Sequence, residues 1–302
     1  MLTPAPSPAP KPAIRVRHLW HRFGKVDVLR DVSFDVHEGE IFGFIGPNGA
    51  GKTTTIRVMA TLLEPMAGKV EIDGWDVTID PQAVRKVIGY MPDHAGVYER
   101  VTVREYLEFF ADAYRVPTAG TTYAVVDAVM ELTDLTKLRD KLVATMSKGM
   151  KQRLQLARTL LHDPKVLILD EPASDLDPRA RIEIRDLLVE LRAMGKTIFL
   201  SSHILTELAD VCTSVAILER GRLVVSGPIA DIARRLEAAQ AQAAPAQEPP
   251  GETLAAIATG TAPAFAPAPA PQAPAAVGGV PGRNVRVRAL APGEAVYAAL
   301  VS

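Results

Sequence analysis

Short, almost uninterrupted apolar runs recur along the first three-quarters of the chain. They lie at 32–36, Ile41–Ile45, Val166–Leu169 and 197–200, and they are rich in Val, Ile and Phe. Runs of this length and composition predict strands that are buried within a sheet.

Segments with a helical spacing of apolar residues lie between and after these runs. They predict helices at 52–63, 103–114, Ala124–Leu132, 147–161, 179–194 and 204–209. Strands that alternate with helices indicate an α/β domain with a substantially parallel sheet. The opening segment, 14–40, instead favours antiparallel hairpins with turns at Gly24 and at Glu38–Gly39.

Composition divides the chain into folded and unfolded parts. Residues 1–13 and 237–282 are rich in Pro and Ala, and no Lys or Arg lies between Arg235 and Arg283. Such segments have too few large apolar groups to offset their conformational entropy, so we expect a disordered tail and a disordered linker. The folded domain is therefore expected at 14–236. Beyond the linker, the alternation in 284–290 predicts that 283–302 starts a small βα domain that is cut short.

The bulk properties exclude several classes of protein. A formal net charge of −1 gives no indication of nucleic-acid binding, so no nucleic-acid partner is expected. The single Cys212 excludes an intrachain disulfide and fits a reducing cytosol. The longest uncharged run, 253–282, is broken by prolines and predicts no spanning helix. Any link to a membrane must therefore come through a partner.

A glycine-rich loop follows the apolar run at Ile41–Ile45 and opens a helix. Its sequence, GPNGAGKTT, lets backbone N–H groups point at phosphate oxygens at the positive end of the helix. This is the pattern of a P-loop, in which Lys52 bridges the β- and γ-phosphates of ATP and Thr53 holds Mg²⁺. The predicted ATP-binding residues of this loop are Gly46, Pro47, Asn48, Gly49, Ala50, Gly51, Lys52, Thr53 and Thr54.

Two acids end the apolar run at Val166–Leu169. Ligands of parallel sheets bind at the carboxyl ends of the strands, so Asp170 is placed to hold Mg²⁺ through water. Glu171, one residue further on, is placed to orient an attacking water or accept its proton. Together with Lys52, this pair predicts hydrolysis of ATP rather than binding alone.

Four further motifs appear in order around the P-loop and the acid pair. The segment MSKGMKQ at 146–152 resembles the LSGGQ signature of ABC transporter ATPases, and 173–177 is similar to their D-loop. The segment SSH at 201–203 resembles their switch-histidine loop, and Phe23 matches the aromatic residue that stacks on adenine. Over 14–236 the chain therefore resembles the ATPase subunit of an ABC transporter.

The resemblance implies a fold, a dimer and residue roles. The fold is the α/β P-loop ABC-ATPase fold, with a mixed or parallel core sheet, an N-terminal antiparallel β subdomain and a helical subdomain at about 95–160. ATP is sandwiched in a head-to-tail homodimer, where Ser147 and Gly149 of one copy face the γ-phosphate held by the other. His203 hydrogen-bonds that phosphate and the attacking water. Ser147 also suits the N-cap of the helix that follows it.

Two motifs depart from the family pattern. Asp93 stands where the family has Gln, or sometimes Glu, and we expect its carboxylate near Mg²⁺; the alternative is that it caps a turn after Pro92. In the signature, Lys148 replaces the first Gly and Met150 replaces the Gln. Ser147 and Gly149 are retained, so we expect an active ATPase.

The segment at 96–114 resembles the drug- and lipid-exporter branch of the family, in which the multi-span permease is a separate polypeptide. The resemblance implies that a coupling helix of the permease packs near Asp93 and the helical subdomain. The loop residues expected at that interface are Tyr98, Glu99 and Arg100. The amphipathic positions expected in the core are Val103, Leu107, Phe110 and Tyr114.

The sequence thus predicts a cytoplasmic ATPase subunit, peripheral on the plasma membrane through its permease and using ATP and Mg²⁺ to power export. One alternative is a non-transport ABC ATPase that acts on DNA or ribosomes, which the single cassette, the single Cys and the absence of a heptad run disfavour. Another is a nucleotide-gated binding module with weak hydrolysis, which Asp93 suggests and which Glu171 and His203 disfavour.

Removal of 238–302 should leave a folded domain that still binds ATP, because the linker contributes little to a core. The measurement is the thermal midpoint and the ATP affinity of the truncated chain beside the full chain. A large fall in the midpoint would contradict the linker interpretation.

Overall fold

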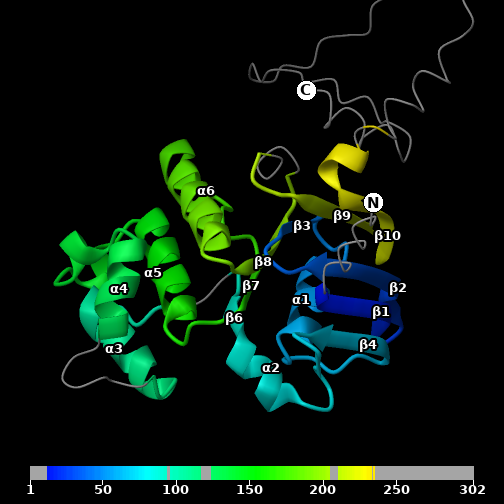
Figure 1. Ribbon diagram of the computed structural model, residues 1–302, viewed down its shortest axis with the longest axis horizontal. Helices are drawn as coiled ribbons and strands as arrows, with labels where there is room; N and C mark the ends of the chain where they lie inside the picture. Colours follow the sequence, from blue (N-terminus) through cyan, green and yellow to red (C-terminus); the bar gives the residue numbers. More distant parts are fainter. Residues whose placement is uncertain (1–11, 94–95, 117–123, 205–209, 233, 235–302) are drawn as a thin grey trace, which may run out of the picture. The chain divides into compact units, whose positions relative to one another are not determined.

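The computed structural model describes residues 12–93, 96–116, 124–204, 210–232 and 234 (Figure 1). All of them belong to one compact unit, Met1–Arg235. The predicted linker at 237–282, the βα unit at 283–302 and all but the first residue of the helix at 204–209 lie outside the described residues. The predicted N-terminal tail was too long, because the first strand already begins at Pro12 and Ala13 is buried.

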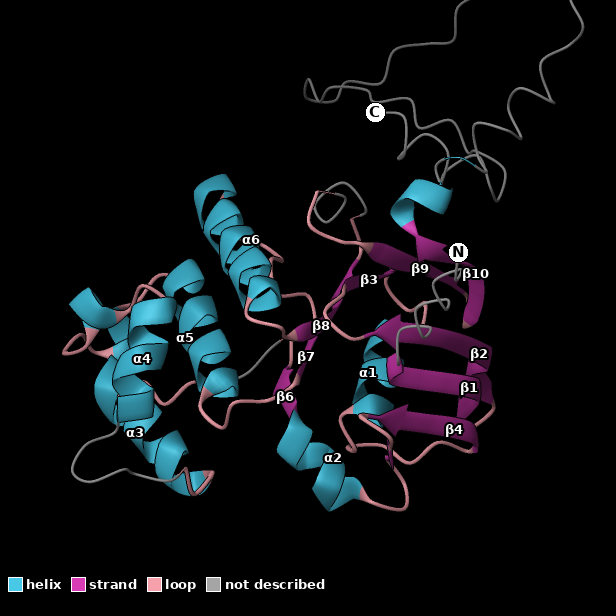
Figure 2. Ribbon diagram, in the orientation of Figure 1, coloured by secondary structure: helices cyan, strands magenta, loops and turns pink. Residues whose placement is uncertain are grey.

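An antiparallel sheet opens the described chain. β1 (Pro12–Phe23) pairs with β2 (Val26–His37) around a turn at Gly24, whose φ of 57° favours glycine. β4 (Ala67–Ile72) and β5 (Trp75–Asp76) complete the order β2-β1-β4-β5, of which β2, β1 and β4 are seen side by side in Figure 2. The hairpin at Gly24 is confirmed. A second hairpin at Glu38–Gly39 is wrong, because that turn carries the chain into another sheet and the second neighbour of β1 is β4.

The central sheet is mixed and mostly parallel. In the described residues its strands are β3 (Ile41–Ile45), β6 (Ile88–Met91), β7 (Val166–Leu169), β8 (Thr197–Ser202), β9 (Ser214–Glu219) and β10 (Arg222–Pro228). Their order is β10-β9-β3-β8-β7-β6, and only β10 runs antiparallel to its neighbour. Every residue of β3, β7 and β8 is buried, as their apolar runs predict.

A cluster of four phenylalanines joins the two sheets. Phe34 comes from β2, Phe42 and Phe44 from one face of β3, and Phe199 from β8, in register with Phe42. Their ring centroids lie 5.3 to 5.9 Å apart. Rings at such spacing add to the stabilisation from apolar burial, so the cluster anchors β3 between the sheets.

The helices are α1 (Lys52–Met59), α2 (Pro81–Val87), α3 (Val103–Ala113), α4 (Ala124–Leu132), α5 (Lys148–Leu160) and α6 (Pro178–Ala193), with 3₁₀ turns η1 (Thr136–Leu138) and η2 (Val143–Thr145). α1 is shorter than predicted, because Thr61 adopts a left-handed φ of 60° just after it. α2 was missed, since seven residues carry too little periodicity; Asp80 and Pro81 at its start were the available signal.

Side-chain caps fix where three helices begin. Thr102 and Glu105 form a reciprocal capping box at the start of α3. The Ser147 hydroxyl accepts a hydrogen bond from the Met150 amide at 3.3 Å, and Asp177 caps α6 in the same way. The prediction that Ser147 caps its helix is confirmed.

α3, α4 and α5 pack together to form the helical subdomain, and α5 also contacts β6 and α6 (Figure 1). Val103 and Leu107 are fully buried there, as predicted. Phe110 is only half-buried, and Tyr114 is 42% exposed and stacks on His162. The core prediction is therefore wrong for Tyr114, because the buried face of α3 turns toward Tyr106 and Ala111 instead. None of the described helices has both the length and the apolar character needed to cross a bilayer.

Native Cys212 should resist alkylation, because burial raises the pKa of its thiol to about 12 and the thiolate is the reactive form. Labelling by iodoacetamide at pH 8 should be slow for the native chain and fast in urea. The chain has a single cysteine, so the labelled mass reports this site directly. Rapid labelling of the native chain would contradict the burial.

Candidate nucleotide-binding site

The loop at 46–53 connects β3 to α1 and depends on glycine at two close approaches. A Cβ on Gly51 would lie 2.7 Å from a methyl of Leu29, and its φ of 111° suits only glycine. A Cβ on Gly46 would lie 2.3 Å from the backbone oxygen of Leu218. A larger residue at either position would collide with the Leu29 side chain or the Leu218 backbone, so this loop conformation requires glycine at both.

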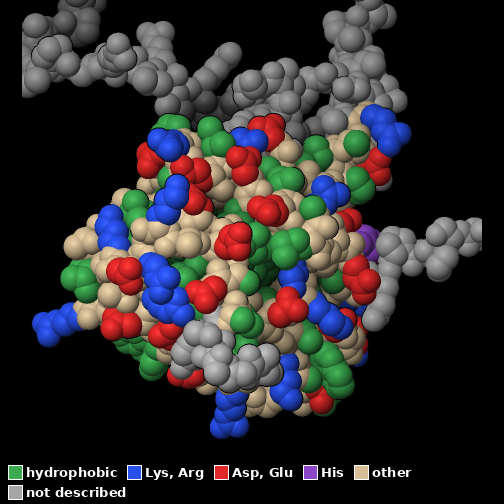
Figure 3. Space-filling model, turned by 60° about the vertical axis from the view of Figure 1, so that its left-hand side comes forward, with side chains coloured by type: hydrophobic (Ala, Val, Ile, Leu, Met, Phe, Trp, Pro, Cys, Tyr) green, Lys and Arg blue, Asp and Glu red, His purple; other side chains and the backbone are tan. Residues whose placement is uncertain are grey.

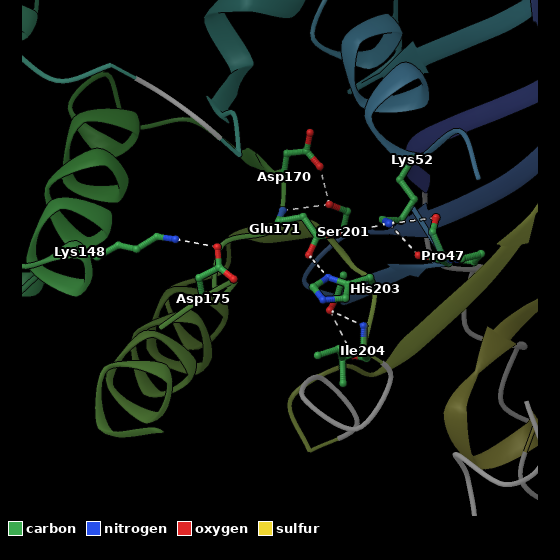
Figure 4. A network of polar contacts seen from close by, with 11 residues as sticks. Pro47, Lys52, Lys148, Asp170, Glu171, Asp175, Ser201, His203 and Ile204 are labelled. Atoms are coloured by element: carbon green, nitrogen blue, oxygen red, sulfur yellow. Dashed lines mark hydrogen bonds and ion pairs between the residues drawn. The ribbon is translucent and has the colours of Figure 1, made fainter. Parts of the chain in front are cut away.

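Lys52 lies at the first position of α1, and its side chain is buried. Its ammonium donates to the backbone oxygen of Gly46 at 2.7 Å and lies 3.3 Å from Oε1 of Glu171 (Figure 4). The P-loop lysine is therefore in contact with the predicted catalytic acid, a pairing that the sequence did not predict.

The other end of the Glu171 carboxylate reaches His203. Nδ1 of His203 lies 2.9 Å from Oε2 of Glu171, so this carboxylate joins β7, β8 and the P-loop (Figure 4). Glu171 adopts a left-handed φ of 51°, a conformation that costs a non-glycine residue about 1–2 kcal/mol. Such strain at a cluster of charged side chains is typical of a functional site.

Ser201 organises the acid pair, and the sequence assigned it no role. Its hydroxyl donates to Oδ1 of Asp170 at 2.6 Å and accepts from the Glu171 amide at 3.0 Å (Figure 4). Leu169 pairs with Leu200 across the parallel strands β7 and β8, so the next residues, Asp170 and Ser201, are neighbours. The signal that could have identified Ser201 is its position as a polar residue at the end of a buried apolar strand.

Asp170 is buried among oxygen atoms that suit a hard cation. Burial raises the pKa of its carboxyl, and the nearby Asp93 and Glu171 add to that rise, whereas hydrogen bonds from Ser201 and Thr53 oppose it. Within the described part of the chain, no group of three or more His, Cys, Asp or Glu forms a metal centre by itself. Mg²⁺ is commonly held by one or two carboxylates together with substrate phosphates, and Asp170, Asp93 and the Thr53 hydroxyl fit that donor set.

A cleft of about 540 Å³ opens above the loop. Three of its lining residues, Val28, Ser174 and Asp175, were not among the predicted site residues. The others were predicted: Phe23, Pro47, Asn48, Gly49, Gly51, Lys52, Thr53, Thr54, Asp93, Glu171 and His203. Phe23 is 49% exposed and lies edge-on to His21, with 4.6 Å between the ring centroids. Gly46 and Ala50 are not part of this lining and belong to the floor of the loop.

Ser147 and Gly149 are not among the residues that line this cleft. A Cβ on Gly149 would lie 2.8 Å from Cβ of Ala180, so glycine lets α5 approach α6 closely. The structure thus gives Gly149 a packing role that the sequence did not reveal.

The fold and the cleft together define the class. A P-loop between a buried strand and a helix, with an acid pair at the end of the next strand but one of a mostly parallel sheet, is the arrangement of a P-loop nucleotide-binding ATPase.

Comparison with known proteins specifies the family. Residues 29–174 match the ABC transporter family. The chain is 45% identical over 199 residues to the ABC transporter ATP-binding protein YhcH of Bacillus subtilis, which covers 65% of the chain and 64% of that protein. It is 38% identical over 218 residues to the Nod factor export ATP-binding protein I of Burkholderia lata, covering 72% of the chain and 71% of that protein.

A solved structure of the ATP-binding subunit of an ABC transporter superposes with a TM-score of 0.65. It is 34% identical to the chain and covers 74% of the chain and 93% of the solved protein. The chain belongs to the ABC transporter ATP-binding family, and the predicted fold is confirmed. Its matched part spans less than two thirds of YhcH.

Ser201→Ala should weaken both the fold and hydrolysis. The buried Asp170 oxygen and the Glu171 amide lose their shared partner, which should lower the free energy of unfolding by about 1–3 kcal/mol and slow ATP turnover. Urea unfolding and steady-state ATPase rates measure the two effects. Ser214→Ala is the matched control, since Ser214 is a buried strand serine whose hydroxyl donates to Glu40 and not to either acid of the pair. Equal effects of the two variants would remove Ser201 from its organising role.

Proposed function

We propose that this chain is the ATP-hydrolysing subunit of an ABC exporter and drives a separate membrane permease. The observation that carries the proposal is the Glu171 carboxylate, held between Lys52 and His203 in the cleft above the P-loop. Nucleotide binding alone does not require a carboxylate beside the phosphates, whereas hydrolysis requires a residue that orients the attacking water.

The ion pairs at this site suggest how ATP engages it. Triphosphate oxygens would draw the Lys52 ammonium away from Glu171, which leaves the carboxylate free to orient the attacking water. His203 remains within reach of both the carboxylate and the γ-phosphate. Thr53, Asp170 and Asp93 are the residues that would hold Mg²⁺, which supplies neutralisation of phosphate charge when bound.

The proposed working unit is a head-to-tail homodimer. Ser147 and Gly149 lie outside the cleft of their own chain, which agrees with their serving the nucleotide of a second copy. The Ser147 hydroxyl accepts a hydrogen bond from the Met150 amide, so this side chain already lies at the amino end of α5. In the dimer, this end of the helix would face the γ-phosphate, where its partial positive charge favours an anion.

An apolar groove of about 570 Å³ is the proposed seat of the permease. It is lined by Tyr98, Glu99, Arg100, Val101, Glu105, Tyr106 and Phe109. Tyr98 and Phe109 are 58% and 53% exposed, and their rings meet edge-to-face. Exposed aromatic residues beside an arginine are typical of protein interfaces. Acidic and basic side chains are interspersed on the face drawn in Figure 3, which suits a protein partner better than a nucleic-acid backbone.

The direction of transport and the cellular location are proposed from the relatives of this chain. The Burkholderia lata relative is described by name as an export protein, and we extend that direction of transport to this chain. Attachment to a permease would place the chain on the cytoplasmic face of the plasma membrane as a peripheral subunit.

Glu171→Gln should abolish steady-state ATP turnover and trap an ATP-bound dimer. The amide retains the size of the carboxylate and loses the charge that orients water and pairs with Lys52. ATPase rates and size-exclusion chromatography with MgATP test both effects, and Glu131→Gln, on the exposed surface of α4, is the matched control. Turnover like that of the wild type would remove Glu171 from its assigned role.

A further inference from the structure

An ion pair connects the signature helix to the rim of the nucleotide cleft. Nζ of Lys148, the first residue of α5, lies 2.9 Å from Oδ2 of Asp175, in the loop between β7 and α6 (Figure 4). The side chains are 56% and 74% exposed, so neither is needed to fill a core. Lys148 is the residue that departs from the glycine of the family signature.

Asp175 lines the cleft, and this gives the ion pair a relation to the nucleotide. The cleft lining contains three carboxylates, Asp93, Glu171 and Asp175, against a single ammonium, that of Lys52. Lys52 already pairs with Glu171. A triphosphate that enters this cleft brings several negative charges close to the Asp175 carboxylate, and like charges at short range repel.

We infer that Lys148 is a positioning residue for ATP, which acts by neutralising Asp175 at the rim of the cleft. The inference rests on the proposed ATP site. Lys148 does not line the cleft of its own chain, so within one chain its effect on the nucleotide passes through the carboxylate that it pairs with. Without the ammonium, the Asp175 carboxylate loses its ion pair with Lys148, and the rim presents more negative charge to the triphosphate.

The neighbouring lysine of the same helix supplies a control. Lys151, one turn along α5, pairs with Glu99 at 3.3 Å, and Glu99 does not line the nucleotide cleft. Lys151→Ala and Lys148→Ala therefore remove the same charge from the same helix end. Only Lys148→Ala exposes a carboxylate in the cleft.

The experiment is a titration of the full chain with MgATP by isothermal calorimetry at low and high salt. Lys148→Ala should bind ATP about three- to tenfold more weakly at low salt, and the difference should shrink at high salt because exposed charges are screened. Lys148→Arg should bind as the wild type does. Asp175→Asn introduced into Lys148→Ala should restore the affinity, because it removes the negative charge of the carboxylate.

Kinetics give a second readout that a purely structural role would not move. Lys148→Ala should raise KM for ATP and leave kcat close to that of the wild type, since the repulsion acts on the bound substrate and the transition state alike. Thermal unfolding of each variant checks that the fold is retained.

Three results would overturn the inference. They are an unchanged affinity of Lys148→Ala at low salt, an equal loss in Lys151→Ala, and a failure of Asp175→Asn to restore binding. A wild-type chain that binds and hydrolyses ATP alongside any of these leaves the proposed function standing. A wild-type chain that does not bind MgATP overturns both.

Discussion

The parallel pairing of β3, β8 and β7 is the constraint on which the site depends. It aligns three carboxyl ends at one edge of the sheet. There β3 leads into the P-loop, β7 leads into Asp170 and Glu171, and β8 contains Ser201 near its end and leads into His203. These segments are far apart in sequence, and only the ladder of backbone hydrogen bonds brings them together. A shift of register by one residue would turn alternate side chains to the opposite face and separate Asp170 from Ser201.

Burial strengthens the polar contacts at this edge, and it also raises the free-energy cost of leaving any of these polar groups without a partner. Asp170 is almost fully buried, and an unpaired carboxylate there would be costly. Ser201 and Thr53 donate hydrogen bonds to the Asp170 carboxylate and offset part of that cost. The backbone amide of Asp170 is also paired, because it donates to the Met91 backbone oxygen at 2.8 Å. Because Ser201 also holds the Glu171 amide, the buried acid and the cleft-lining acid are fixed as one unit.

Sequence patterns predicted those parts of the molecule whose causes are local. Apolar runs identified β3, β7 and β8, and Ser147 identified the start of α5, because burial on both faces and helix capping each leave a local signature. β6 and β10, the edge strands of the central sheet, were missed, and so was the internal strand β9, although its apolar run VAIL resembles that of β7. The contact of Lys52 with Glu171 and the packing of Gly149 on Ala180 arise from tertiary structure alone, so no pattern near either residue could reveal them.

The lysines of this site share one electrostatic arrangement. Lys52 is paired with Glu171 and Lys148 with Asp175, so both ammonium groups already have a carboxylate partner before any phosphate arrives. The two pairs differ in burial: the Lys52 side chain is 6% exposed and that of Lys148 56%. The buried lysine therefore interacts in a lower dielectric and has more to gain from exchanging a shared carboxylate for a triphosphate. The exposed lysine acts at the rim, where water already weakens its attraction, and its contribution lies in cancelling a charge that would otherwise oppose the nucleotide.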